Sequence, residues 1–233
     1  MKIASLDNRG IPYIIKETKQ NKISISVKND GTIIVKRNRY IKESKVIDFV
    51  NDHIVWIEKA YLKHYQPPRK FISGEEYLLM GKTHHLKIIY SSKDLVEVDF
   101  EKQIINIYTT STAFSHFEML MDKYLKKLAL EIFSVLLEDA LNKTKPFFEI
   151  HPLLYIKHYK SRWGCCVPKD NKIVLNQALI HVDLDLISFV ILHELCHFKY
   201  LNHSKEFHQT LMQFAPNERE LRKRLNKFSP EYH

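Results

Sequence analysis

Residues 186–203, LISFVILHELCHFKYLNH, join a strongly apolar run to three histidines and a glutamate. The run LISFVIL is apolar on every side of a helix, and a helix of this kind is normally buried. Burying polar side chains that lack partners costs several kcal/mol. The sequence therefore predicts a buried helix over about residues 183–200, whose polar side chains are satisfied by a bound metal ion.

The spacing of these polar side chains is that of a zinc site. Residues four apart share a helix face, so His193 and His197 project side by side, and Glu194 lies about 100° around the axis. This is the zincin arrangement H-E-x-x-H, in which two imidazoles bind zinc and the glutamate acts on a water molecule. We therefore predict Zn²⁺ as the cofactor and Glu194 as the catalytic residue.

A catalytic zinc takes three protein ligands, and His203 is the expected third. It lies beyond the predicted helix, so the chain must turn to bring it back. Asn202 tolerates the left-handed conformation that ends many helices, and Ser204 can cap the next helix. Glu206 and His208 are near enough in the sequence to compete for the metal, so these two alternatives remain open.

The three cysteines do not form a disulfide framework. Their number is odd, and Cys165 and Cys166 are neighbours, so a reducing cytoplasm is the expected location. Cys196 points away from the two motif histidines and is expected to be a small core residue. No apolar stretch reaches the roughly 18 residues of a membrane helix, and no signal peptide is evident. We expect a cytoplasmic protein without membrane association.

The hydrophobic pattern predicts an α+β protein, with a β-rich N-terminal half. Gly74, Gly81 and the triplet Asn29-Asp30-Gly31 predict turns, the last one a hairpin. Strands are expected within residues 11–37, 75–81, 84–90, 95–100, 103–108, 149–159 and 172–176, and helices within 41–63, 115–141, 183–200 and 204–227 with a break at Pro216. The expected domains are a β-rich region with one helix over residues 1–114 and a zincin-like domain over residues 115–233, whose active-site helix packs on a small sheet.

Positive charge is concentrated near the N-terminus. The chain has a net charge of +9; residues 1–70 hold 15 Lys/Arg and 7 Asp/Glu, a net +8, and the other 163 residues hold 21 and 20, a net +1. A basic region of this kind could attract nucleic acid. The basic residues are scattered rather than clustered, which is more typical of a solvated surface.

The segments around the motif resemble the YgjP-like metal-dependent hydrolase family, a zincin-type metallopeptidase family akin to SprT-like proteases. The resemblance rests on KSRWGCCVPKDNKIVLNQALI at residues 160–180 and HELCHFKYLNHSKEF at 193–207. The glycine-containing segment at residues 71–86, FISGEEYLLMGKTHHL, is also similar to this family. The resemblance thus extends over nearly the whole chain.

The family resemblance implies three metal ligands and one catalytic base: His193, His197 and His203, and Glu194. This chain departs from the family pattern at two positions. Cys165 stands where serine is usual, and His208 stands where an aromatic residue is usual. The second departure makes His208 a candidate for a spare ligand or a substrate contact.

Arg162 and Trp163 precede the strand expected at residues 172–176. Arg162 could stabilise an oxyanion or bind a carboxylate or phosphate of the substrate. Alternatively, Arg162 and Trp163 stack on one another and brace the metal helix. The strand near the metal in zincins pairs with an extended substrate backbone.

The sequence predicts a zinc-dependent metallopeptidase that acts on peptides or proteins. In this mechanism, Glu194 activates a zinc-bound water that attacks the amide carbonyl. One alternative is a metal-dependent nucleotide or phosphoanhydride hydrolase, which Arg162 and the basic N-terminal region would suit. Phosphate hydrolases more often use Mg²⁺ with carboxylates, so the histidines favour zinc and a carbonyl. Another alternative is a nucleic-acid-associated protease module.

Overall fold

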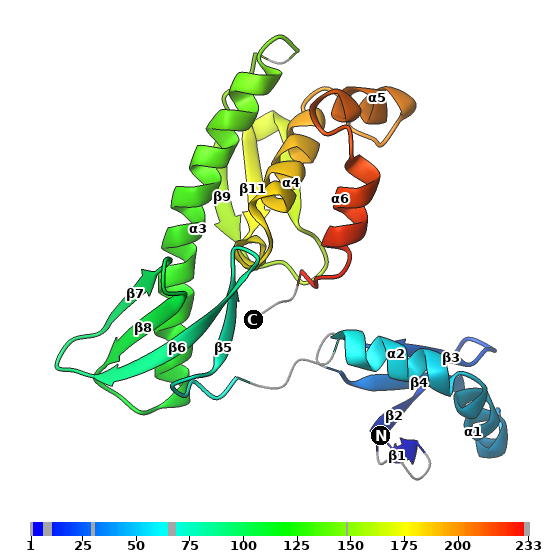
Figure 1. The fold of residues 1–233 in the computed structure, drawn as a ribbon. Coiled ribbons are helices and arrows are strands. Elements are labelled where there is room, and N and C mark those ends of the chain that lie inside the picture. The colour runs from blue at the N-terminus through cyan, green and yellow to red at the C-terminus, as the bar shows by residue number, and fades with distance from the viewer. Residues whose placement is uncertain (1, 7–10, 29–30, 65–68, 148, 231–233) are drawn as a thin grey trace. The chain divides into compact units, whose positions relative to one another are not determined.

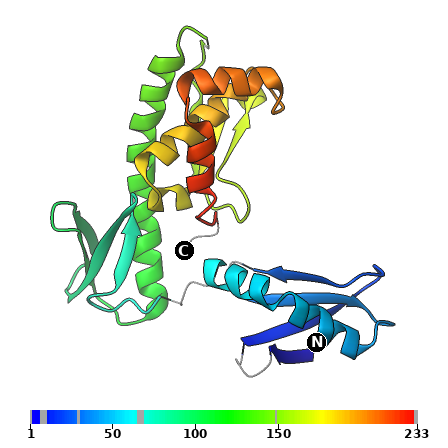
Figure 2. The same cartoon turned by 45° about the vertical axis from the view of Figure 1, so that its right-hand side comes forward.

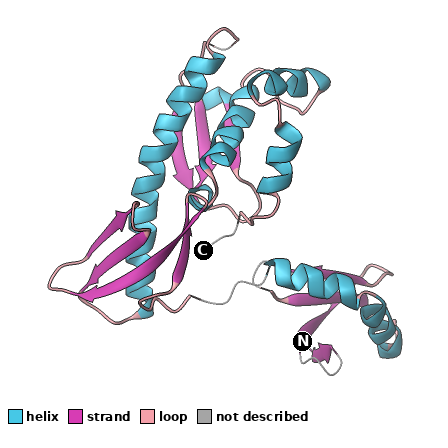
Figure 3. Cartoon of the chain, in the orientation of Figure 1, coloured by secondary structure: helices cyan, strands magenta, loops and turns pink. Residues whose placement is uncertain are grey.

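The chain forms two compact units, Met1–Pro68 and Arg69–His233, each with its own hydrophobic core. The computed structural model describes residues 2–6, 11–28, 31–64, 69–147 and 149–230. Their helices and strands form a mixed α+β architecture (Figure 3). None of the helices in these residues is long and apolar enough to span a membrane.

In the first unit, two helices cover one face of a four-stranded sheet with the order β1-β2-β4-β3 (Figure 1). The elements are β1 (Lys2–Leu6), β2 (Ile11–Thr18), β3 (Ser24–Val27), β4 (Ile33–Asn38), α1 (Glu43–Asp52) and α2 (Ile54–His64). The antiparallel pairing of β3 with β4 confirms the predicted hairpin, and Gly31 has a φ of 77°. Asn29 and Asp30 of that turn lie outside the described residues.

The expected single helix over residues 41–63 is two helices. His53 separates them, with a φ of −107° and a ψ of 9°. Its ring Nδ1 lies 2.8 Å from the carbonyl oxygen of Phe49, so the side chain folds back onto the last turn of α1. Helical periodicity continues across this break, which is why the sequence pattern did not reveal it.

A long helix, α3 (Phe114–Thr144), runs through the second unit (Figure 1, Figure 2). One end packs on a four-stranded sheet with the order β5-β6-β8-β7, formed by β5 (Glu76–Leu79), β6 (Lys82–Tyr90), β7 (Leu95–Asp99) and β8 (Ile104–Thr109). This sheet and the helix share one core. The two compact units divide between residues 68 and 69; the expected functional domains, residues 1–114 and 115–233, stay a prediction.

The remainder of α3 packs against a small three-stranded sheet and a buried helix. The elements are β9 (Leu153–Lys157), β10 (Gly164–Val167), β11 (Lys172–Asn176), the 3₁₀ helix η3 (Gln177–His181), α4 (Leu184–Cys196), α5 (Lys205–Phe214) and α6 (Glu218–Leu225). The sheet order is β10-β11-β9, with β10 at an edge. Helix α4 contacts β10, β11, α3, α5 and α6. The predicted packing of the motif helix on a small sheet is confirmed.

The turn between β5 and β6 connects the β5–β8 sheet to the residues that precede α4. Met80 and Gly81 have φ values of 48° and 73°, as a tight hairpin turn requires. The backbone N–H of Met80 donates to the carbonyl of Ile180 at 2.7 Å, and that of Gly81 donates to the carbonyl of His181 at 3.1 Å. A Cβ on Gly81 would lie 2.0 Å from the Asp183 carboxylate, so this close approach requires glycine.

Candidate metal centre

Helix α4 presents the motif at its C-terminal end. Most of its side chains are buried, including Leu186, Ile187 and Ile191, which are 0% exposed. The helix ends at Cys196 rather than near residue 200. Beyond Cys196 the backbone N–H groups of His197, Phe198 and Lys199 donate to the carbonyls three residues earlier, at 3.2, 3.1 and 3.2 Å, so the helix closes in a tighter 3₁₀-type turn. The thiol of Cys196 is fully buried, as expected for a core residue.

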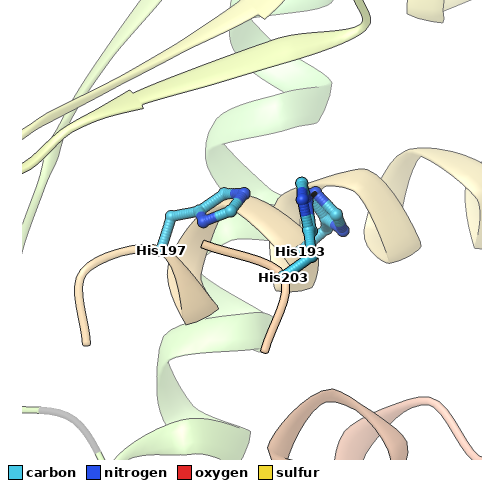
Figure 4. A group of neighbouring side chains, drawn as sticks. All are labelled: His193, His197 and His203. Atoms are coloured by element: carbon cyan, nitrogen blue, oxygen red, sulfur yellow. Dashed lines mark hydrogen bonds between the residues drawn. The ribbon is translucent and has the colours of Figure 1, made fainter. Parts of the chain in front are cut away.

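The structure brings His193, His197 and His203 together at this turn (Figure 4). One ring nitrogen of each lies within 4.8 Å of those of the other two. The Nε2 atoms of His193 and His203 are 3.0 Å apart. His197 Nδ1 lies 2.9 Å from the carbonyl oxygen of Tyr200. Donation by Nδ1 to this carbonyl leaves Nε2 of His197 as the free electron-pair donor.

The loop between α4 and α5 delivers His203 without a left-handed residue at Asn202. The non-glycine residues with positive φ in the described part of the chain are Phe71, Met80, Gln103 and Asn171. The expected role of Asn202 is therefore wrong, because the chain leaves the helix six residues earlier. The Ser204 hydroxyl accepts a hydrogen bond from the Phe207 N–H at 3.3 Å, which confirms the predicted cap of α5.

Phe207 lies beneath the three imidazoles. Its ring centroid is 5.0 Å from that of His193, 4.8 Å from that of His197 and 4.9 Å from that of His203. The side chain is 0% exposed, so it forms a fixed apolar base for the group. No role was predicted for Phe207, although it is the last residue of the family-like segment HELCHFKYLNHSKEF at residues 193–207.

The three histidines fit a divalent metal ion. His193 Nδ1 is buried and has no hydrogen-bond partner among the described residues. Burial, followed by the nearby His197 and His203, lowers the pKa of His193 to about 3, so its ring is neutral, as a metal ligand requires. Zinc–nitrogen distances of about 2.0–2.1 Å place tetrahedral ligand nitrogens roughly 3.3 Å apart. The 3.0 Å separation of the His193 and His203 Nε2 atoms is close to this value, and the remaining ligand nitrogens lie within 4.8 Å of one another.

Glu194 lies on the neighbouring face of α4, against strand β10. Its side chain is buried and accepts a hydrogen bond from the backbone N–H of Cys166. Burial raises the pKa of Glu194 to about 7, although the Cys166 N–H and the Arg162 charge act in the opposite direction. A carboxyl group with a pKa near neutrality is suited to accept and release protons.

Gly164 allows Glu194 to approach the strand. A Cβ at position 164 would lie 2.8 Å from Oε1 and 2.9 Å from Cγ of Glu194. Contacts this short are essentially absent from real structures. The glycine in the S-R-W-G segment is thus explained by its packing against the motif glutamate.

Gly164→Ala is expected to displace the Glu194 carboxylate. With Glu194 as the predicted catalytic residue, kcat/KM for the predicted peptide cleavage should fall roughly 10- to 100-fold, because small misplacements of catalytic groups have effects of this size. The metal content should not change, since the three atoms nearest to the added methyl group all belong to Glu194. Steady-state kinetics and elemental analysis on the same preparation test this. An unchanged kcat/KM would show that the position of Glu194 does not depend on Gly164.

Asn176 holds the segment that carries Arg162 and Trp163. Its Nδ2 donates to the carbonyls of Tyr159, Arg162 and Pro230 at 2.9, 3.0 and 2.8 Å. The backbone N–H of Asn176 donates to the carbonyl of Trp163 at 2.8 Å. The Arg162 guanidinium lies over the Tyr159 ring, 5.5 Å from its centroid, and Trp163 packs against the core of the second unit.

A cleft of about 480 Å³ runs along the metal centre and strand β10. Arg162 and Trp163 line it, together with Glu194 and the three histidines. Arg222 of α6 also lines this cleft. Arg222 could not be predicted as a cleft residue, since its place depends on how α6 packs against α4.

His208 and Glu206 lie outside the histidine group. His208 Nδ1 is 3.2 Å from Oε1 of Glu218, and its ring centroid is 6.3 Å from that of His203. Glu206 is exposed near the start of α5. The group of side chains in the described residues that could hold a metal at this site contains neither of them.

Comparisons with known proteins match most of the chain to one family. A family model described as "YgjP-like, metallopeptidase domain" matches residues 21–228. No curated protein matches the chain. Two crystal structures are similar to part of it, the metallopeptidase zymogens abylysin of Pyrococcus abyssi and jannalysin of Methanocaldococcus jannaschii. Both are 23% identical with a TM-score of 0.36; the matches cover 40% and 41% of this chain, and 90% and 94% of those chains.

Proposed function

The chain belongs to the YgjP-like metallopeptidase family and is a metal-dependent hydrolase; from this premise we propose that it cleaves peptide bonds with Zn²⁺. The proposed ligands are His193, His197 and His203, and the proposed general base is Glu194. The observation that carries this proposal is the convergence of three imidazole nitrogens within 4.8 Å of one another, on the helix that also carries Glu194.

Each residue of the site has a role that follows from its position. A bound zinc would polarise the substrate carbonyl and lower the pKa of a water molecule. Glu194 takes a proton from the attacking water and transfers it to the leaving amine. The Cys166 N–H orients the Glu194 carboxylate. Strand β10 lies at the edge of its sheet and lines the cleft with Gly164 and Cys166, a position in which an extended peptide substrate can pair with a strand.

His203→Ala is expected to lose the metal and to lower peptide cleavage at least 100-fold, since two imidazoles do not complete a catalytic zinc site. Elemental analysis of purified protein should give about one zinc per wild-type chain and far less in the variant. The matched control is His208→Ala, which removes a nearby histidine from outside the group and should keep its zinc. Loss of zinc from the control as well would contradict the proposed ligand set.

The same preparations can be assayed with unstructured peptides and with nucleoside triphosphates. We expect zinc-dependent cleavage of the peptides and none of the triphosphates, because the donor set consists of imidazoles rather than the carboxylates that Mg²⁺ prefers. Zinc-dependent hydrolysis of triphosphates without cleavage of peptides would overturn the proposed activity.

A further inference from the structure

The cleft beside the metal centre is positively charged. Among its lining residues, Glu194 is acidic, and Arg162 and Arg222 carry positive charges. The two arginines act on different parts of the site: the charge of Arg162 affects Glu194, and that of Arg222 affects His193 and His203. A divalent metal ion would add further positive charge. A cleft of this kind attracts anionic groups of a substrate.

Arg222 is held in place by a buried carboxylate. Its guanidinium donates to Oε1 of Glu218 at 2.7 Å, one helical turn earlier on α6. Oε1 of Glu218 also lies 3.2 Å from His208 Nδ1, so Arg222 and His208 both contact this carboxylate. Burial raises the pKa of Glu218, but the hydrogen bonds with Arg222 and His208 outweigh this, and the net shift is downward. Glu218 is therefore ionised at neutral pH.

The exposure of this ion pair is asymmetric. The side chain of Glu218 is 9% exposed and that of Arg222 is 45% exposed. Arg222 lines the cleft, and Glu218 is not among the residues that line it. A substrate in the cleft therefore meets the cation and not the carboxylate. A guanidinium has five N–H donors in a planar fork, so donors remain for a second anion.

We propose that Arg222 binds a carboxylate of the peptide substrate and so selects peptides with a negative charge close to the scissile bond. This inference rests on the proposed peptidase function and specifies its substrate class. The carboxylate has two sources, an Asp or Glu side chain or the C-terminus of the peptide. An arginine can bind either carboxylate, because the N–H groups of its planar guanidinium match the two carboxylate oxygens.

The test uses zinc-loaded full-length protein and a synthetic peptide library built in matched pairs. In one set, each sequence occurs with Asp or Glu at a given position and with Asn or Gln at the same position. In the other set, each sequence occurs with a free C-terminal acid and with a C-terminal amide. Mass spectrometry gives kcat/KM for each cleaved peptide. In one of the two sets, we expect kcat/KM for the acid member of each pair to be about 10- to 100-fold higher than for its neutral partner. The set that shows this difference identifies whether the bound carboxylate is a side chain or the C-terminus.

Three variants connect this preference to Arg222. Arg222→Gln is expected to abolish the preference for the acid members but still to cleave the neutral members. Arg222→Lys should retain part of this preference, since the positive charge remains and the planar guanidinium is lost. Arg219→Gln removes the same charge from the same helix, outside the cleft lining, and should keep the wild-type preference.

The possible failures are distinguishable. Equal cleavage of both members by the wild type, or an unchanged preference in Arg222→Gln, overturns this inference and leaves the peptidase function intact. A zinc-loaded wild type that cleaves no peptide overturns the proposed function and this inference with it.

Discussion

Glu194→Gln is expected to lower kcat for peptide hydrolysis about 10²- to 10⁴-fold, the range that a positioned general base contributes. The amide has nearly the same size as the carboxylate, so the packing against Gly164 is preserved. It can no longer accept a proton from the attacking water. Because Glu194 is not part of the histidine group, the zinc content should equal that of the wild type. Single-turnover kinetics and elemental analysis measure the two quantities.

The control for this variant is Glu206→Gln. Glu206 is a carboxylate near the same histidines, but it is exposed on α5 and lies outside the histidine group. The kcat of the Glu206→Gln variant should stay within about 2-fold of the wild-type value, because surface substitutions have small effects. If Glu194→Gln retained full activity, Glu194 would not be the base, and the proposed mechanism would have to be abandoned.

Asn176→Leu is expected to destabilise the second unit by about 3–5 kcal/mol, because leucine fills the volume of the side chain without replacing its hydrogen bonds. Asn176 is 0% exposed. The substitution leaves the carbonyls of Tyr159, Arg162 and Pro230 without this donor. It also removes the oxygen that accepts from the Ala178 N–H at 3.1 Å. Thermal and urea unfolding of the full chain measure the loss.

The control for the stability measurement is Asn142→Leu, the same substitution at an exposed position of α3. It should change the free energy of unfolding by no more than about 0.5 kcal/mol. A similarly small change in Asn176→Leu would show that the Tyr159–Trp163 segment is held by other contacts.

The motif helix and its neighbours could be predicted because their signals are local. The four-residue spacing of His193 and His197 determines the face that they share. The cap of α5 requires only Ser204 and the N–H of Phe207, three residues later. Hairpins and helix periods are likewise encoded within short windows of sequence.

Contacts between distant residues could not be predicted in this way. The packing of Gly164 against Glu194 joins residues on a strand and a helix thirty positions apart. Arg222 reaches the cleft only because α6 contacts α4. The β5–β8 sheet appears in the sequence as a continuation of the preceding strands, and only its shared core with α3 assigns it to the second unit. Hydrophobic periodicity carries no information about such pairings.

The hydrogen bonds from the Met80-Gly81 turn to Ile180 and His181 have a consequence for the order in which the elements pack during translation. Because the ribosome delivers the N-terminal part first, the β5–β8 sheet and α3 emerge before α4. The turn therefore offers a ready docking point when residues 180 and 181 leave the exit tunnel. Of the elements that bury the apolar surface of α4, α3, β10 and β11 precede it in the chain, whereas α5 and α6 follow it. The group of His193, His197 and His203 is therefore completed late, after α4 and the start of α5 have emerged.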